Sequence, residues 1–238
     1  MNTILWLHGF PHSSQIFEKQ RAITGVNHVM PDLPGFGTAP PPRTSMTIDD
    51  YAWYALDAVG NGKAIFAGLS MGGYICFAAL RLFRERVAGL ILIDTRETAD
   101  TEEARKQRYA SIEKVRQDGV APLVDSMLPK MLTSAAPHET REWVRGIMMA
   151  SSVEGVIRAQ EAMAERPDSS ALLPTVDVPT LIVVGEEDPV TPPSDAERMA
   201  AAIPNARLVK LANAAHLSNV EQADAFNEAI RNAGVLAG

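Results

Sequence analysis

The sequence has little of three features that would assign it to particular classes of protein. It contains a single cysteine, Cys76, so the chain cannot form a disulfide bond within itself. Its 22 basic residues are outnumbered by 29 acidic ones, which gives a formal net charge of −7 and argues against nucleic acid as a partner. No apolar run approaches the roughly 18 residues that suggest a membrane-spanning helix. We therefore expect neither a nucleic-acid-binding protein nor a membrane protein.

Export and metal-binding signals are also missing. The first residues, MNTILWLHGF, have neither the basic leader nor the long apolar stretch of a signal peptide. No group of cysteines and histidines has the spacing of a metal site. We expect a cytoplasmic protein without a bound metal.

The composition and the apolar pattern predict an α/β protein. The 238 residues are 46% hydrophobic and 21% charged, as in ordinary globular proteins. Short runs rich in Ile, Val and Leu, typical of strands buried on both faces, alternate with helical segments, which indicates a parallel sheet with helices on both faces. The expected strands are Thr3–Leu7, Asn27–Met30, Lys63–Ala67, Ala88–Ile93, Thr180–Val184 and Ala206–Leu211. The expected helices of the core are Ile48–Val59, Gly72–Phe83, Ser194–Ala202 and Ala223–Asn232.

The middle of the chain interrupts this alternation, because residues 100–168 contain no convincing strand. They predict helices instead, the first with Thr101 as a possible N-cap. The expected helices are Thr101–Gln117, Val120–Leu132, Pro137–Ala150 and Val153–Glu165. We predict a first core segment over 1–98, a helical cap over 99–169 and a second core segment over 170–238.

Apolar side chains of the cap have two possible roles. Met127, Met131 and Trp143 could line an apolar substrate pocket, together with Leu217 from the core, because ligand pockets are mostly apolar. Alternatively, the cap residues simply pack the cap onto the core. Both interpretations stay open at the level of the sequence.

One segment predicts a reactive serine. The sequence GLSMG at residues 68–72 follows an expected strand and precedes an expected helix. This context is that of a nucleophile elbow, in which a tight, strained turn raises a serine above the sheet. Small residues two positions before and after the serine allow the strand and helix to approach closely. Ser70 is therefore the candidate nucleophile.

A serine hydroxyl needs a base, and histidine is the usual one near neutral pH. Of the five histidines, His216 lies in a short loop after the last expected strand. Chemistry on such a sheet uses loops at the carboxyl ends of the strands, and the order serine, acid, histidine along the chain fits His216. The other histidines are His8, His12, His28 and His138.

The base must be oriented by an acid, and the loop 185–192 offers three acidic residues, Glu186, Glu187 and Asp188. We favour Asp188, because Pro189 stiffens the chain beside it and a short side chain suits a fixed orientation. Asp94, at the end of an expected strand, is the alternative, although we expect it to cap the turn that follows.

A tetrahedral intermediate carries an oxyanion, which needs hydrogen-bond donors. The residue after the nucleophile supplies one backbone N–H, which here belongs to Met71. We expect the second donor to be the N–H of Phe10, in the loop after the first strand. The segment 32–37, DLPGFG, lacks the features of a phosphate-binding loop and is interpreted as a turn that shapes the core.

These motifs occur in the order found in α/β-hydrolases, which the chain resembles over essentially its whole length. The segments that carry the resemblance are HGFP at 8–11, DLPGFG at 32–37, GLSMGG at 68–73, GEED at 185–188 and AHLSN at 215–219. Within this family the chain is most similar to small carboxylesterases and 3-oxoadipate enol-lactonase-like enzymes. The resemblance implies an α/β-hydrolase fold with a helical cap, the roles given above, and no cofactor.

The sequence departs from the family pattern in two places. The family usually has further strands before the His-Gly turn, so we expect a mostly parallel sheet of about six strands without them. Many relatives also have glycine before the histidine, where this chain has Ala214 and Ala215. Serine at the elbow, instead of aspartate, argues against dehalogenases and epoxide hydrolases.

The predicted function is a serine hydrolase that cleaves carboxylic esters of small, fairly apolar substrates through an acyl-enzyme. One alternative is an enol-lactonase, a C–C bond hydrolase or a perhydrolase, in which Arg141, Arg145 or Arg158 could bind a substrate carboxylate. The other is a ligand receptor without catalytic activity, since a fold alone does not dictate function.

Overall fold

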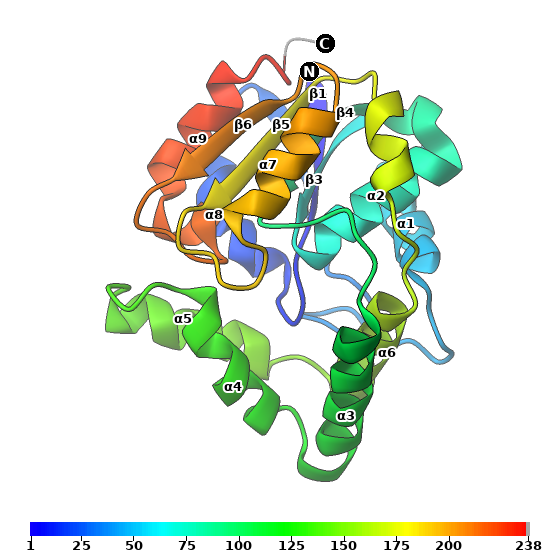
Figure 1. Cartoon of the computed structure of the whole chain (residues 1–238), viewed down its shortest axis with the longest axis vertical. Coiled ribbons are helices and arrows are strands. Elements are labelled where there is room, and N and C mark those ends of the chain that lie inside the picture. Colours follow the sequence, from blue (N-terminus) through cyan, green and yellow to red (C-terminus); the bar gives the residue numbers. More distant parts are fainter. Residues whose placement is uncertain (237–238) are drawn as a thin grey trace.

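The computed structural model describes residues 1–236 and contains one sheet of six strands (Figure 1). The strands pair in the order β2-β1-β3-β4-β5-β6, and every pair is parallel. This confirms the predicted parallel sheet and the predicted number of strands. The strands are β1 (Asn2–Leu7), β2 (Val26–Val29), β3 (Ala64–Leu69), β4 (Val87–Ile93), β5 (Thr180–Gly185) and β6 (Arg207–Leu211).

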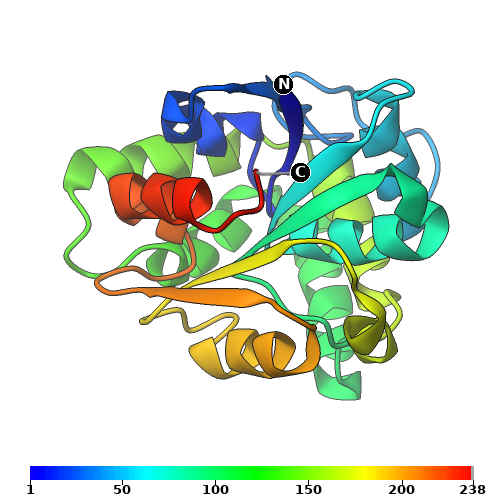
Figure 2. The ribbon, with the colours of Figure 1, turned by 90° about the horizontal axis from the view of Figure 1, so that it is seen from above.

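The strands are apolar throughout because both faces of the sheet are covered. Along β1, Leu5 and Leu7 join one buried cluster, whereas Ile4 and Trp6 join the other. One face packs against α1 (Ile48–Asp57), α2 (Met71–Phe83) and α7 (Pro193–Ala202), and the other against the 3₁₀ helix η1 (Ser14–Ala22), α8 (Ser218–Glu221) and α9 (Ala223–Asn232). Seen from above, these two groups of helices lie on opposite sides of the sheet (Figure 2).

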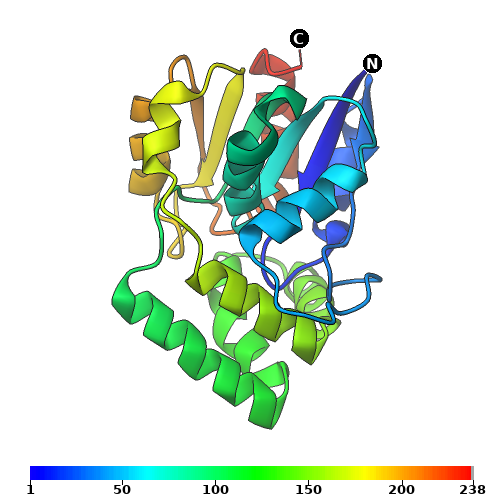
Figure 3. The same ribbon diagram turned by 90° about the vertical axis from the view of Figure 1, so that its right-hand side faces the viewer.

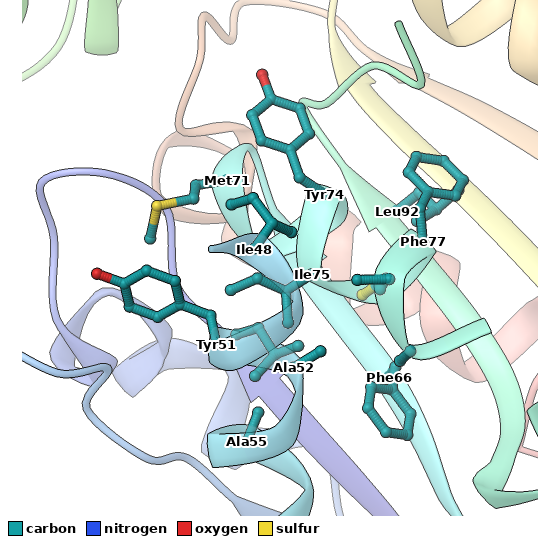
Figure 4. Close-up of a cluster of buried hydrophobic side chains, with 14 of the residues drawn as sticks. Ile48, Tyr51, Ala52, Ala55, Phe66, Met71, Tyr74, Ile75, Phe77 and Leu92 are labelled. Atoms are coloured by element: carbon teal, nitrogen blue, oxygen red, sulfur yellow. The ribbon is translucent and has the colours of Figure 1, made fainter. Parts of the chain in front are cut away.

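Helices α1 and α2 hold the elbow region in place. A capping box begins α1, because the Thr47 side chain and the Asp50 side chain each accept a hydrogen bond from the other residue's backbone N–H. Ile48 and Tyr51 of α1 and Ile75 of α2 are buried in one cluster with the strands (Figure 4). This packing fixes the start of α2, where the candidate nucleophile lies.

The predicted helical insertion is present as α3 (Glu102–Asp118), α4 (Ala121–Met131), α5 (His138–Met149) and α6 (Val153–Ala164). Thr101 caps α3 as expected, since its side chain accepts from the Ala104 N–H at 3.2 Å. Helix α3 packs against α6, and α4 packs against α5. These four helices form a separate layer facing the carboxyl ends of the strands (Figure 3). We call residues 102–164 the helical segment.

The turn at residues 32–37 joins the core to the helical segment. A β-carbon on Gly35 would lie 2.3 Å from the Gly155 Cα, so both positions require glycine for this close approach. The Ser152 N–H and hydroxyl donate to the Gly35 carbonyl at 3.0 and 2.9 Å. The turn therefore shapes the fold, as the sequence indicated, by positioning α6.

Four short elements were not predicted: η1, α8 and the 3₁₀ helices η2 (Arg84–Arg86) and η3 (Ser170–Thr175). A 3₁₀ helix has three residues per turn and so lacks the 3.6-residue period by which helices are detected. Helix α8 has only four residues, which is too short to show that period. Among residues 1–236, no helix combines the length and the apolar character needed to cross a membrane.

Candidate active site

Ser70 lies in the tight turn between β3 and α2 with a strained backbone. Its φ of 51° is in a region that L-residues avoid, at a typical cost of about 1–3 kcal/mol. The turn is possible because residues 68 and 72 are glycines, which have no β-carbon. A β-carbon on Gly72 would lie 2.0 Å from the Leu7 carbonyl oxygen, and one on Gly68 would lie 2.3 Å from the Gly72 backbone. The predicted close approach of strand and helix is therefore present.

Three hydrogen bonds hold the strained turn. The Ser70 N–H donates to the Ile93 carbonyl at 2.9 Å. The Ser70 carbonyl accepts from the Gly73 N–H at 2.9 Å and from the Thr95 hydroxyl at 2.7 Å. Sequence reasoning missed Thr95, which acts on the backbone of Ser70 from the loop after β4.

His216 is the histidine that the structure brings to the serine. Its Nε2 lies 2.9 Å from the Ser70 Oγ, and its Nδ1 lies 2.8 Å from the Asp188 Oδ2. Since a carboxylate can only accept, Nδ1 carries the proton of the neutral ring, and Nε2 is left to accept from the serine hydroxyl. The ring is 2% exposed, so water competes little for these bonds.

Asp188 is held in place by the loop that carries it. Its Oδ1 accepts from the N–H groups of Val190 and Thr191 at 2.7 and 3.1 Å, and its Oδ2 accepts from the Thr191 hydroxyl at 2.6 Å. The two competing acids, Glu186 and Glu187, are exposed. Burial raises the pKa of Asp188, but the His216 charge and these hydrogen bonds outweigh burial and hold the pKa below 3.8.

The loop after β1 brings the Phe10 N–H to the same end of the sheet as the Met71 N–H, at the start of α2. No hydrogen bond within residues 1–236 uses either donor. His8 fixes this loop, because its Nε2 accepts from the Leu33 N–H and its Nδ1 donates to the Gly9 carbonyl, both at 2.9 Å. Burial lowers the pKa of His8 to about 4, so its ring stays neutral.

The comparisons with known proteins identify the family of the chain. Residues 4–229 match the description of the alpha/beta hydrolase family. The chain belongs to this family.

Three relatives illustrate its place in the family. The 3-oxoadipate enol-lactonase 2 of Acinetobacter baylyi is 30% identical over 178 residues, which are 74% of this chain but only 65% of that protein's length. A thermophilic esterase from Thermogutta terrifontis, solved with malate bound, is 37% identical, with a TM-score of 0.93 over 97% of this chain and 88% of its own. The enol-lactonase from Burkholderia xenovorans is 26% identical, with a TM-score of 0.88 over 98% and 90% of the two chains.

Asp94 of this α/β-hydrolase does not cap the following turn, so that expectation was wrong. Its side chain is buried and joins two distant loops instead: Oδ1 accepts from the Gly185 N–H at 2.8 Å, and Oδ2 accepts from the Ser218 N–H and hydroxyl at 3.1 and 2.6 Å. One loop carries Asp188 and the other His216. Burial, and then the charge of Asp188, raise the pKa of Asp94 to about 7.

The electrostatics around His216 predict the pH dependence expected of this residue as a base. Burial lowers the pKa of His216, but the charge and hydrogen bond of Asp188 and the charge of Asp94 outweigh it and raise the pKa above 6.5. A base acts only when neutral, so kcat/KM is expected to fall with decreasing pH, with a midpoint above 6.5. Measuring kcat/KM for a 4-nitrophenyl ester between about pH 5 and 9 tests this. Asp94→Asn is expected to move the midpoint to lower pH. A flat profile would contradict the role of His216 as the base.

The helical segment is bonded to the two neighbours of His216, directly to Leu217 and through Glu221 of α8 to Ala215. Glu221 accepts from the Ala215 N–H at 2.7 Å through one oxygen, and from the Thr133 N–H and hydroxyl at 2.8 and 2.7 Å through the other. On the other side, the Leu217 N–H donates to the Met131 carbonyl at 3.0 Å. Thr133 and Met131 lie at the end of α4, so the position of α4 is coupled to that of the histidine.

The four candidate pocket residues differ in their surroundings. Met131 and Leu217 are fully buried in the apolar cluster between α4, α5 and the sheet. Met127 and Trp143 are partly buried and pack against that cluster. All four therefore serve packing, and their contact with substrate stays a prediction.

The three arginines of the lactonase alternative have partners within the protein. Arg145 pairs with Asp125 at 3.0 Å, and Arg141 donates to the Thr133 carbonyl at 2.9 Å. Arg158 pairs with Glu154 and Glu161 at 2.7 and 2.9 Å. Across residues 1–236, no cluster of three or more His, Cys, Asp or Glu side chains is arranged to hold a metal ion.

Proposed function

We propose that the protein is a serine carboxylesterase that hydrolyses esters of small, fairly apolar substrates through an acyl-enzyme. The observation that carries this proposal is the continuous path from the Ser70 Oγ to the His216 Nε2 at 2.9 Å, and from Nδ1 to Asp188 at 2.8 Å. Both distances are within hydrogen-bond reach, as a nucleophile, its base and an orienting acid require. The strained φ of Ser70 also supports its role as the nucleophile, because backbone strain is found most often at functional sites.

In the first half of the reaction, the Ser70 Oγ attacks the ester carbonyl carbon while the His216 Nε2 takes the hydroxyl proton. Asp188 keeps the imidazole oriented and stabilises its charged form. The N–H groups of Phe10 and Met71 donate to the oxyanion of the tetrahedral intermediate. His216 then returns the proton to the leaving alcohol oxygen as the carbon–oxygen bond breaks, and the acyl group remains on Ser70.

In the second half, water takes the place of the alcohol. His216 accepts a proton from the water while the water oxygen attacks the acyl carbon. The oxyanion again forms between the two N–H donors. The bond to Ser70 then breaks, Ser70 recovers its proton from His216, and the acid leaves. Each group returns to its starting protonation state, so the cycle needs no cofactor.

The helical segment is proposed to be a cap over this site, with the boundaries at 99–169 that the sequence predicts. The second core segment is proposed to span 170–238, of which residues 237 and 238 lie outside the described residues. The layer faces the carboxyl ends of the strands (Figure 3). Ser70 directly follows the carboxyl end of β3. Met127, Met131 and Trp143 would give the inner side of this layer an apolar character, and Leu217 would add to it from the core. Such a lining favours small apolar acyl or alcohol groups.

An enol-lactonase is the second candidate, favoured by the two relatives of that name. The serine attack on a lactone carbonyl follows the same steps, except that the leaving oxygen stays attached to the acyl group. Arg141, Arg145 and Arg158 already bond to groups of the protein. This argues against the form of the lactonase hypothesis in which these arginines bind a substrate carboxylate. The two candidates are therefore separated by substrate preference and not by the machinery.

The test is hydrolysis of 4-nitrophenyl acetate and butyrate, combined with intact mass and peptide mapping after treatment with a fluorophosphonate. Turnover and a single adduct on Ser70 are expected. An adduct without turnover of these esters would move the proposal to lactones, to be assayed next. A folded protein with neither turnover nor adduct would contradict the hydrolase proposal and favour a ligand receptor.

A further inference from the structure

His12 lies in the loop after β1, close to the candidate nucleophile. The backbone N–H of His12 donates to the Gly9 carbonyl at 2.9 Å. Gly9 in turn lies against the nucleophile, since a β-carbon on Gly9 would lie 3.3 Å from the Ser70 Cβ. The hydroxyl of Ser151, between α5 and α6, donates to the carbonyl of Pro11 at 3.0 Å. The loop that carries His12 is thus held between the nucleophile and the helical segment.

The imidazole of His12 is buried without hydrogen bonds. It is 1% exposed, and no partner within residues 1–236 bonds to either ring nitrogen. By contrast, His8, His28 and His216 each use both ring nitrogens. Buried polar groups nearly always have a partner, so an unpaired one in the loop that packs against Ser70 points to a partner that arrives with the substrate.

The ring of His12 is neutral. Burial, and then the charges of His8 and His216, lower the pKa of His12 to about 3, against the opposing effect of the nearby Gly9 carbonyl. A neutral imidazole offers one N–H donor and one acceptor nitrogen. It cannot take over the role of the base, since that role needs a group that titrates near the working pH.

We propose that His12 is a substrate-binding residue that hydrogen-bonds a hydroxyl or keto oxygen carried by the substrate near its ester carbonyl. The inference rests on the proposed esterase function and narrows its substrate class to oxygen-substituted esters. A site built to bond a hydroxyl rejects the analogue that lacks it, because the buried polar group of the protein is then left unpaired.

A neutral oxygen substituent fits this site better than a carboxylate. A neutral ring contributes no positive charge, and a carboxylate at a buried position needs a cation to offset its desolvation. A hydroxyl group can donate to one ring nitrogen or accept from the other, so it suits either tautomer of His12.

The test compares matched pairs of esters: ethyl lactate against ethyl propionate, and ethyl 3-hydroxybutyrate against ethyl butyrate. The quantity is the ratio of kcat/KM for the substituted ester to that for the plain one. We expect the wild type to favour one substituted ester by about tenfold. His12→Leu and His12→Met, which are apolar and of similar size, are expected to lower this ratio about fivefold or more. His12→Gln keeps a donor and an acceptor and is expected to restore part of it.

Stability provides a second readout. Removing an unpaired buried polar group is expected to raise Tm in the apolar variants, as long as their shape fits. His138→Gln, on an exposed histidine of α5, is the matched control and should change neither ratio nor Tm. A ratio near one in the wild type, or a ratio unchanged in folded His12→Leu and His12→Met, would overturn the inference. Absence of the Ser70 fluorophosphonate adduct in the wild type marks failure of the esterase proposal itself, and the inference falls with it.

Discussion

Ser70→Ala is expected to lower kcat/KM for 4-nitrophenyl acetate by at least about 10⁴-fold. The variant removes the nucleophile, and nothing else at the elbow can form the acyl-enzyme. The fluorophosphonate adduct should disappear with the activity. Folding should be unaffected, since the Ser70 side chain contributes a bond to His216 but its backbone carries the strained turn.

The same experiment with His216→Ala and with the double variant tests whether the two residues act as a unit. Each single change should lower kcat/KM nearly as much as the double change does, because a serine without its base and a base without its serine are equally ineffective. Ser134→Ala, at an exposed serine of the helical segment, is the matched control. Additive losses, or a Ser70→Ala variant that retains more than about one hundredth of the activity, would contradict the proposed mechanism.

The sheet and the long helices could be predicted because their signals are local. The continuous apolar runs of β3, β4 and β5 reflect burial on both faces, and their alternation with helices gives the parallel order. The GLSMG segment was informative for a similar reason, since Gly68 and Gly72 are needed within one turn. Observed boundaries lie within about two residues of the expected ones, as is usual where helix and strand ends depend on single hydrogen bonds.

The contacts that assemble the site could not be predicted, because they join residues far apart in the chain. Asp94 bonds to Gly185 and Ser218, and Glu221 bonds to Thr133, and no local pattern marks either pair. A carboxylate after a strand was interpreted by its nearest neighbours, which favoured a turn cap. Its actual partners depend on where the loops after β5 and β6 meet.

The loop before His216 shows how a family departure is accommodated. The sequence has Ala214 and Ala215 where the family resemblance implied glycine, and neither alanine has a positive φ. The left-handed residue of this turn is Asn213, with a φ of 56°, and asparagine tolerates that conformation better than most residues. Ala214 and Ala215 therefore need no conformation reserved for glycine, and the loop holds His216 between Ser70 and Asp188.

Gly72 contacts the backbone of β1 and also shapes the turn that carries Ser70. Gly72→Ala is therefore expected to lower both the stability of the fold and the activity. Its new β-carbon would lie 2.0 Å from the Leu7 carbonyl oxygen and 2.7 Å from the Leu7 carbonyl carbon. Both are backbone atoms at the carboxyl end of β1, a strand paired on both sides, and they cannot move aside as a side chain can. We expect a loss of about 3 kcal/mol in the free energy of unfolding, at the upper end for overpacking. In a chain of this size that lowers Tm by roughly 6–12 °C.

Gly146→Ala is the matched control with the opposite sign. Gly146 lies inside α5, is exposed, and has no atom within 4 Å of the position of a new β-carbon. Alanine there should stabilise the helix by about 0.5–1 kcal/mol, because glycine loses more backbone freedom on folding. Thermal unfolding of both variants, followed by circular dichroism together with ester turnover, separates the steric effect from the general effect of replacing glycine. A Gly72→Ala variant with wild-type Tm would mean that the elbow can shift away from β1, and the strained conformation of Ser70 would then not be fixed by this contact.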